Sequence, residues 1–155
     1  MFTFRKSKKS LWIFLDVDGV LNRRNNWAKP FTLNPQNISV FRELLSILGT
    51  SYKYSIILTS SWRKGWCPRQ QPPHLSALCD AVPIAHTLPL ALADTDRGKG
   101  ILTYMKQYNY TGARLTLDDD ETLFRVEERE AINLYTINYL TGFQKDDIPK
   151  VRHLL

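Results

Sequence analysis

A short apolar run that ends in two acids constrains the fold of this chain more than any other feature. Residues 11–15 are continuously apolar, and Asp16, Asp18 and Gly19 follow them directly, in the segment FLDVDGVLN (residues 14–22). A continuous apolar run without alternation is typical of a β-strand that is buried on both faces. Strands of this kind occur in parallel sheets, which are covered by helices on both sides. The sequence therefore predicts a central parallel strand with carboxylates at its carboxyl end.

Helical and strand patterns alternate along the rest of the chain. Pro35–Leu48 has apolar residues at helical spacing, with Asn34 as the expected N-cap, a proline in the first turn and Gly49 as the expected end. Further strands are predicted over residues 54–58, 114–117 and 132–138, further helices over residues 75–80, 98–108 and from about 146, and a loop over residues 66–73. This alternation predicts an α/β fold: a single Rossmann-like domain with three layers and a mainly parallel sheet.

Length and composition agree with a small folded domain. The 155 residues fit one core, and a hydrophobic fraction of 43% is ordinary for a globular protein. We expect one domain over residues 1–155, with residues 1–10 as a basic N-terminal extension. No apolar run approaches the roughly 18 to 20 residues that span a bilayer, and the apolar stretch after the basic N-terminus is too short for a signal peptide. We therefore expect a soluble, cytoplasmic monomer without a membrane partner, whose two cysteines are free thiols.

Polar residues follow each of the first three predicted strands. They are Asp16 and Asp18 after the first strand, residues 59–63 (TSSWR) after the second, Arg97 and Lys99 near the start of a helix, and residues 118–120 (DDD) after the third. In open α/β sheets, ligands bind outside the carboxyl ends of the strands. The sequence therefore predicts that carboxylates, hydroxyls and cations converge on one edge of the sheet.

Phosphoryl transfer through a covalent intermediate needs this set of groups. One carboxylate attacks phosphorus, for which Asp16 is the candidate. A second acid, for which Asp18 is the candidate, protonates the leaving group and then deprotonates water. Clustered carboxylates repel one another and the phosphate, so a hard divalent cation is needed, and Mg²⁺ suits oxygen ligands. A hydroxyl of Thr59 or Ser60 and the ammonium of Lys99 would bind the remaining phosphoryl oxygens.

In these motifs the chain resembles the haloacid dehalogenase (HAD) superfamily of phosphatases. The first motif, an apolar run followed by DxDG, is matched by FLDVDGVLN. The later motifs are matched by SIILTS with Thr59, by GKGIL with Lys99, and by LTLDDD with Asp118 and Asp119. Arg97 precedes the same helix as Lys99 and could take its place as the cation that binds phosphate.

The resemblance also implies roles for individual residues. Asp16 would be the nucleophile and Asp18 the general acid/base, and the presence of this second acid favours a phosphatase over a dehalogenase or an ATPase. Mg²⁺ would be held by Asp16, by the main-chain carbonyl of Asp18 and by Asp118, with Asp119 supporting the metal site. The run of three acids leaves the position of the metal ligand open by one residue. Gly19 and Ser60 are expected to contact the substrate phosphate.

The spacing of the motifs predicts a HAD domain without a substantial cap. The interval between Asp18 and Thr59 is largely used by the predicted helix and strand. The interval between Thr59 and Lys99 holds a proline-rich loop and little else. An open site suits a macromolecular substrate, because nothing encloses a small one. The segment LTSSWR also resembles small HAD domains associated with nucleic-acid end repair. Arg63 would then lie within reach of the substrate, and Trp62 would either stack on a base or pack as a core aromatic.

The expected function is that of a Mg²⁺-dependent phosphatase that acts on nucleotides or on polynucleotide phosphate ends, in line with a net charge of +6. Two alternatives stay open: a small-molecule or protein phosphatase of the same family, and a non-catalytic, basic nucleic-acid-binding domain. The family's protein phosphatases typically carry DxDxT, whereas this chain has Val20 at the last of these positions. A phosphorelay receiver is disfavoured because its acids follow different strands. A nucleotide kinase is disfavoured because the GxxxxGK[ST] loop does not occur.

Overall fold

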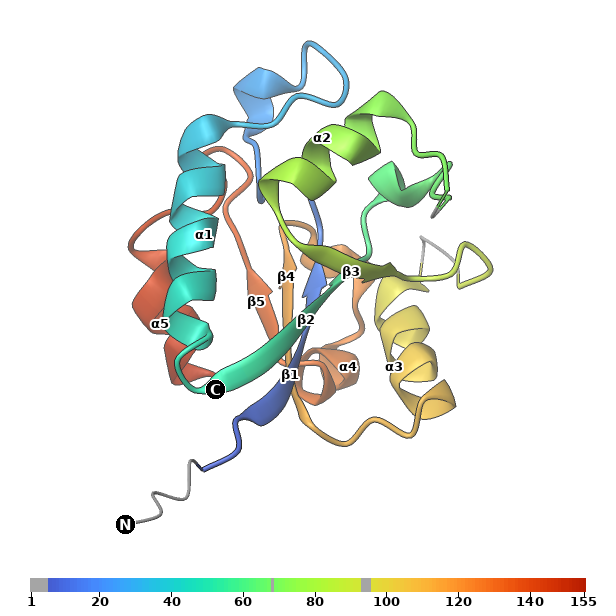
Figure 1. The fold of residues 1–155 in the computed structure, drawn as a ribbon, viewed down its shortest axis with the longest axis vertical. Coiled ribbons are helices and arrows are strands. Elements are labelled where there is room, and N and C mark those ends of the chain that lie inside the picture. Colours follow the sequence, from blue (N-terminus) through green and yellow to red (C-terminus); the bar gives the residue numbers. More distant parts are fainter. Residues whose placement is uncertain (1–5, 68, 93–95) are drawn as a thin grey trace.

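A parallel sheet forms the centre of the molecule (Figure 1). The computed structural model describes residues 6–67, 69–92 and 96–155, and in this part of the chain five strands pair in the order β3-β2-β1-β4-β5. They are β1 (Lys9–Leu15), β2 (Tyr52–Leu58), β3 (Ile84–Thr87), β4 (Ala113–Asp118) and β5 (Leu134–Thr136). Every pairing is parallel, and β1 pairs with both β2 and β4. The apolar run at residues 11–15 is thus the central strand, as predicted.

Helices cover both faces of this sheet, which gives the described part of the chain the three layers that were predicted (Figure 1). The helices are α1 (Pro35–Leu48), α2 (Pro73–Ala81), α3 (Arg97–Gln107), α4 (Val126–Ala131) and α5 (Asp147–His153). Helices α1, α2 and α5 contribute buried residues to one core cluster, and α3 contributes to the cluster on the opposite face, beside α4. Within the described residues, no helix is long and apolar enough to cross a bilayer.

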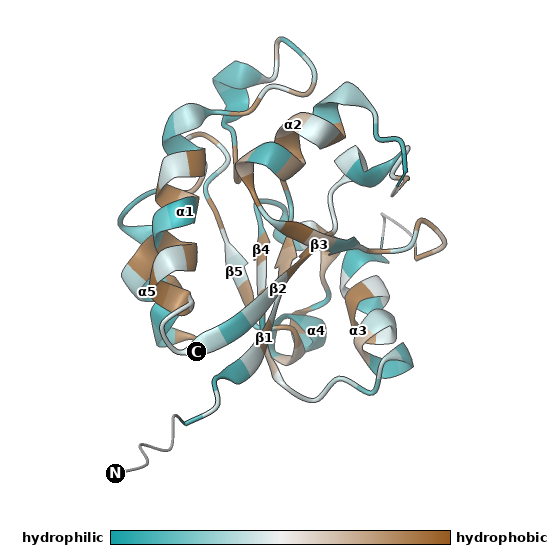
Figure 2. Cartoon of the chain, viewed as in Figure 1, coloured by the Kyte–Doolittle hydropathy of each residue, from teal (hydrophilic) through white to brown (hydrophobic). Residues whose placement is uncertain are grey.

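Side chains of β1 alternate between the two faces and are buried on both. Leu11, Ile13 and Leu15 belong to the cluster under α1, α2 and α5, whereas Phe14 packs in the cluster with Ile101 of α3. These four side chains of β1 and Ile101 are fully buried, and each such burial stabilises the fold by about 1.5–3 kcal/mol. Strand β2 is polar at its start and apolar toward its carboxyl end, where its residues are buried (Figure 2). The carboxyl halves of β1 and β2 are therefore packed in the core, and the residues that directly follow them start from well-packed positions.

Helix α1 has the boundaries that the sequence predicts. The side-chain oxygen of Asn34 accepts hydrogen bonds from the backbone N–H groups of Gln36 and Asn37, at 3.0 and 3.3 Å. Pro35 stands at the first helical position, where no backbone N–H is required, and Gly49 is the C-cap. These local signals suffice because each one satisfies, or makes unnecessary, a hydrogen bond at a helix end.

Three elements differ from the sequence prediction. The interval between Thr59 and Lys99 holds α2 and also β3, which was not predicted. Strand β3 is a four-residue edge strand that is only partly buried and has no alternating pattern. Helix α4 is six residues long and mostly charged, so it has no apolar stripe. The strand predicted over 132–138 is limited to Leu134–Thr136 because Ile132 caps α4 and Asn133 has a left-handed φ of 56°. Of the predicted basic extension, residues 1–5 lie outside the described part, and the last two residues belong to β1.

Candidate active site

The register of the sheet brings the predicted site residues to one level. Leu15 is paired with Leu58 of β2 and with Leu117 of β4, so the next residue of each strand stands at the same edge. The backbone N–H of Asp16 donates to the Leu117 carbonyl at 3.0 Å, and the N–H of Thr59 donates to the Leu15 carbonyl at 2.9 Å. Asp16, Thr59 and the carboxyl end of β4 are therefore held by ladder hydrogen bonds rather than by loops.

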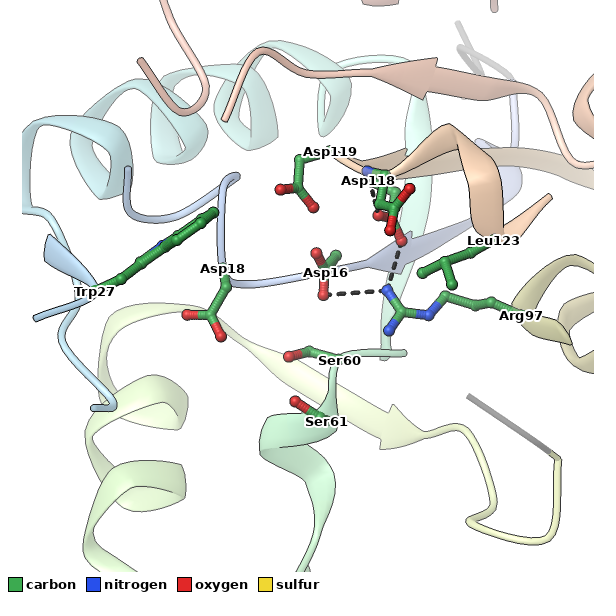
Figure 3. A pocket seen from close by; sticks show the side chains of 10 residues that line it. Asp16, Asp18, Trp27, Ser60, Ser61, Arg97, Asp118, Asp119 and Leu123 are labelled. Atoms are coloured by element: carbon green, nitrogen blue, oxygen red, sulfur yellow. Dashed lines mark hydrogen bonds and ion pairs between the residues drawn. The ribbon is translucent and has the colours of Figure 1, made fainter. Parts of the chain in front are cut away.

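A pocket of about 450 Å³ opens above this edge (Figure 3). Its lining combines five acids, two hydroxyls, one cation and two largely apolar side chains: Asp16, Asp18, Trp27, Ser60, Ser61, Arg97, Asp118, Asp119, Asp120 and Leu123. Figure 3 shows the carboxylate of Asp16 near the centre, with Arg97 on one side and Trp27 on the other. Most of the residues that were predicted from the strand ends thus share one pocket.

Arg97, at the start of α3, is the cation that reaches the carboxylates. Its Nη1 lies 3.2 Å from Oδ1 of Asp16 and 2.6 Å from Oδ2 of Asp118, and the side chain is almost completely buried. Lys99 lies two residues further along the helix, where its side chain is exposed and lines a different hollow with Asp96. The structure therefore brings Arg97, and not Lys99, to Asp16, because only the first residue of α3 points to the end of the sheet.

Burial and mutual repulsion raise the pKa of the carboxyl groups. The pKa of Asp16 lies well above its usual value, first because the group is desolvated and then because Asp118 is close, while Arg97 opposes both effects. Burial also raises the pKa of Asp118, although Arg97 and a backbone N–H of Asp120 favour its charged form. Burial, again the largest cause, raises the pKa of Asp119 to about 6. Ionising all of these groups together is therefore costly without a further cation.

The same carboxylates fit a divalent metal ion. Asp16, Asp118 and Asp119 each offer an oxygen atom, and these atoms lie within 4.8 Å of one another. Such a set of hard oxygen donors suits Mg²⁺, whose charge would offset the repulsion that raises their pKa values. Asp18 is not in this set: its carboxylate lies to one side of Asp16 in Figure 3. Asp120 instead caps the following turn by accepting a hydrogen bond from the N–H of Thr122.

A comparison with protein families identifies the domain. Residues 12–148 match the family model described as the HAD domain in Swiss Army Knife RNA repair proteins. The chain belongs to this family. A search of curated proteins finds no match. Membership agrees with the resemblance of the sequence motifs to HAD domains of nucleic-acid repair, and it supports a phosphatase-type function for the pocket.

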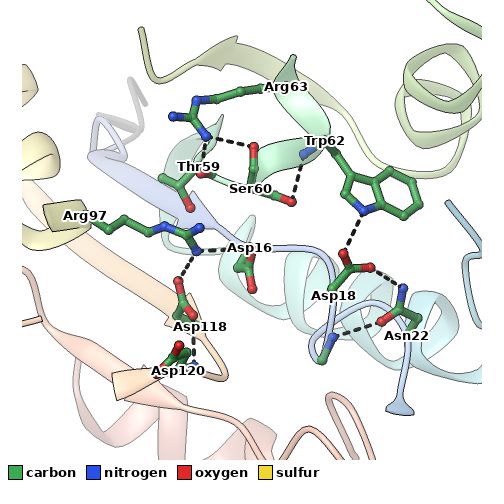
Figure 4. Close-up of polar contacts among 11 residues, drawn as sticks. Asp16, Asp18, Asn22, Thr59, Ser60, Trp62, Arg63, Arg97, Asp118 and Asp120 are labelled. Atoms are coloured by element: carbon green, nitrogen blue, oxygen red, sulfur yellow. Dashed lines mark hydrogen bonds and ion pairs between the residues drawn. The ribbon is translucent and has the colours of Figure 1, made fainter. Parts of the chain in front are cut away.

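The second acid of the HAD motif, Asp18, is held by hydrogen bonds at both oxygens (Figure 4). Trp62 Nε1 donates to Oδ2 at 3.1 Å, and Asn22 Nδ2 donates to Oδ1 at 2.8 Å. The Asn22 side-chain oxygen accepts in turn from the N–H of Gly19 at 2.8 Å and from Trp27 Nε1 at 2.9 Å. Trp62 is therefore a buried wall residue that contacts the acid/base candidate, which favours the packing alternative over base stacking.

The segment after β2 divides into residues that face the pocket and residues that support them. Ser60 lines the pocket, and Thr59 is fully buried with a hydroxyl that has no hydrogen-bond partner among the described residues. Arg63, predicted to contact substrate, is buried instead: it donates to the carbonyls of Leu88 at 2.9 Å, Thr59 at 2.8 Å and Ser60 at 3.0 Å. The structure does not bring Arg63 into the pocket, because its guanidinium braces the turn from behind (Figure 4).

Gly19 does not line the pocket, and the structure leaves no space for a side chain at this position. Its φ is +81°, a left-handed conformation that favours glycine, and a Cβ here would lie 2.2 Å from Oδ2 of Asp119. Sequence reasoning missed Asn22, Trp27 and Ser61. Asn22 stands in the FLDVDGVLN segment, where its position four residues after Asp18 was a usable signal. Trp27 lies in an irregular segment without periodicity, so its approach to the pocket follows only from the fold.

Proposed function

We propose that this HAD domain is a Mg²⁺-dependent phosphomonoesterase that acts on the phosphate of a nucleotide or of a nucleic-acid end, through an aspartyl-phosphate on Asp16. The observation that carries the proposal is the meeting of three carboxylates at one buried edge, where Arg97 contacts two of them. Pairing with a cation normally lowers the pKa of an acid, whereas burial and the neighbouring acids keep the pKa of these three carboxyl groups raised. A site that binds a divalent cation and a phosphate would account for the close approach of the three carboxylates.

The residues of the chain divide the reaction among them. An oxygen of Asp16 forms a bond to phosphorus while the bond to the leaving oxygen breaks, and Asp18 gives that oxygen a proton. In the second step, water attacks phosphorus and gives its proton to Asp18, the bond to Asp16 breaks, and inorganic phosphate is released. Trp62 and Asn22 donate to the oxygens of Asp18 and so stabilise the carboxylate that the first proton transfer leaves.

The phosphoryl group needs partners that do not repel it. Mg²⁺, held by Asp16, Asp118 and Asp119, supplies charge neutralisation when bound. Arg97 is the nearest cation of the chain itself, and its guanidinium can donate to phosphoryl oxygens with more than one N–H. The hydroxyls of Thr59 and Ser60 add neutral donors, and the absence of a partner for the Thr59 hydroxyl among the described residues leaves it available.

An assay of phosphate release tests this proposal. The purified chain would be incubated with Mg²⁺ and, separately, with 3′- and 5′-phosphorylated RNA and DNA oligonucleotides and with mononucleotides. We expect Mg²⁺-dependent release that an Asp16→Asn variant loses by on the order of 10³-fold or more. With Mg²⁺, beryllium fluoride, a mimic of the aspartyl-phosphate, should raise the melting temperature of the wild type but not of this variant.

Two outcomes would contradict the proposal in different parts. Near-wild-type turnover by Asp16→Asn would remove the nucleophile assignment and with it the covalent mechanism. Release from mononucleotides with untouched oligonucleotides would leave the chemistry standing and refute the assignment to polynucleotide ends.

A further inference from the structure

A second hollow adjoins the active-site pocket. It has a volume of about 240 Å³ and shares Asp18, Trp27 and Ser61 with the first pocket, so the two pockets lie side by side. We call it the side pocket and define it by these three residues together with Lys29, Phe31 and Trp62. A group that occupies the side pocket while a phosphate lies beside Asp16 would therefore be a near neighbour of that phosphate.

The walls of the side pocket include two aromatic rings that are open to solvent. Trp27 is 40% exposed and Phe31 is 53% exposed, although side chains of this size are usually buried. Both rings pack against other rings: Trp27 stacks on Tyr139 with centroids 5.9 Å apart, and Phe31 stacks on His74 at 3.9 Å and meets Trp62 at a steep angle with centroids 5.2 Å apart. The neighbouring rings thus hold Trp27 and Phe31 in place, and both keep apolar surface that is open to solvent.

The backbone holds Phe31 in an unfavourable conformation. Its φ is +57°, in the left-handed region, which is unfavourable for a residue with a Cβ. Such strain in an exposed segment beside a catalytic pocket is typical of a site that is organised for a ligand.

The chemistry of the lining selects the ligand. Exposed Lys29 lies in the same hollow as the aromatic rings, which combines a positive charge with stacking surface. Bases stack on aromatic side chains regardless of sequence, and lysine attracts the neighbouring phosphate. We propose that the side pocket binds the nucleoside that carries the scissile phosphate, with its base stacked on Trp27 or Phe31. This inference rests on the proposed function and names the part of the substrate that is recognised; buried Trp62 is a wall of the site and not the stacking residue.

A comparison of paired substrates tests the inference. One oligonucleotide would end in a normal phosphorylated nucleoside, and its partner would end in a phosphorylated abasic sugar, in both ribo and deoxyribo series. We expect the wild type to prefer the normal end by about 5- to 150-fold in kcat/KM, since stacking one base is worth about 1–3 kcal/mol. Trp27→Ala or Phe31→Ala should reduce this preference severalfold. A preference confined to one series would identify RNA or DNA as the source of the base.

Two further variants separate stacking from indirect effects. Trp27→Phe keeps a flat ring but removes the Nε1–H that donates to Asn22, so it should retain most of the preference if stacking is the cause. Loss of the preference in Trp27→Phe to the level of Trp27→Ala would show that Trp27 acts through Asn22 and Asp18, and would overturn the inference. Tyr108→Ala removes an aromatic ring that is 62% exposed on the side of α3 remote from the pocket, and should leave all rates unchanged.

The outcomes also separate this inference from the proposed function. Equal turnover of normal and abasic ends by the wild type overturns the inference and leaves the phosphatase intact. If no substrate is turned over, the binding of the phosphorylated oligonucleotides is measured by fluorescence anisotropy with the same variants. Trp27-dependent preference for the normal end would then support the side pocket although the proposed function had failed, and equal binding of both ends would overturn it.

Discussion

Replacing Gly19 by alanine should separate folding stability from metal binding in a way that the structure makes quantitative. At φ +81° a Cβ costs roughly 1–2 kcal/mol, which in a protein of this size corresponds to a fall of about 2–8 °C in melting temperature. The added carbon would also lie 2.2, 2.5 and 2.8 Å from Oδ2, Cγ and Cβ of Asp119. All of these contacts are far inside van der Waals distance, so the Asp119 side chain must move away from Asp16 and Asp118.

Metal binding should therefore suffer beyond the loss of stability. Displacing a residue that supports a metal site typically reduces affinity by about 10–100-fold. We expect Gly19→Ala to show that loss for Mg²⁺ in isothermal titration calorimetry, together with a smaller rise in melting temperature on addition of Mg²⁺. Phosphatase activity at limiting Mg²⁺ should fall in parallel and recover partly at high Mg²⁺.

Gly65→Ala is a matched control. Gly65 has a similar φ of +85°, but its Cβ would meet only the side chain of Pro72, at 3.0 Å. This variant should lose a comparable amount of stability and keep the Mg²⁺ response of the wild type. Unchanged Mg²⁺ affinity in Gly19→Ala, with a stability loss equal to that of Gly65→Ala, would refute the role of Asp119 in the metal site.

Three further predictions concern the cation, the hydroxyl and the pH dependence. Arg97→Ala should reduce kcat/KM by at least about 100-fold, since the arginine contacts Asp16 directly, whereas Lys99→Ala should change it less than about twofold; steady-state kinetics of both variants decide between the two cations. Thr59→Val should change the free energy of unfolding by less than about 0.5 kcal/mol, because the hydroxyl has no partner among the described residues. The same variant should lower kcat/KM about tenfold or more, and denaturant titration and steady-state kinetics together test both expectations. The pKa of Asp119 is raised to about 6 from a usual value near 4, so the folded state binds this proton more tightly than the unfolded state does. Without metal, the free energy of unfolding should therefore fall as the pH rises from about 4 to about 6. Mg²⁺ should oppose this fall, because it binds the ionised carboxylates, and denaturation in EDTA and in Mg²⁺ at pH 5 and pH 7 would show a metal effect that grows with pH.

Local signals predicted the parts of the fold that depend on local physics. The apolar run of β1 and the Asn34, Pro35 and Gly49 signals of α1 determine burial and helix ends within a few residues of sequence. The edge strand β3 and the charged helix α4 lack such signals, because they are stabilised by neighbours that come from elsewhere in the chain.

The candidate site divides in the same way. Asp16, Thr59 and the acids after β4 could be predicted because they follow strands, and strand ends in a parallel sheet meet. Lys99 and Arg63 were predicted from residue type and motif spacing, which do not report on which side of a turn or a helix a long side chain lies. Trp27 carries no sequence signal at all, since its position depends on contacts with Asn22 and Tyr139.

The ladder hydrogen bonds that hold Asp16 and Thr59 have a consequence for how such a domain can diversify. The groups proposed to react are attached to the sheet itself, whereas Trp27, Lys29 and Phe31 belong to an irregular segment between β1 and α1. Changes of sequence in that segment can alter which molecule is chosen without moving the atoms that react with it. Exchange of residues 23–33 between members of this family is therefore a direct way to transplant substrate preference onto an unchanged catalytic frame.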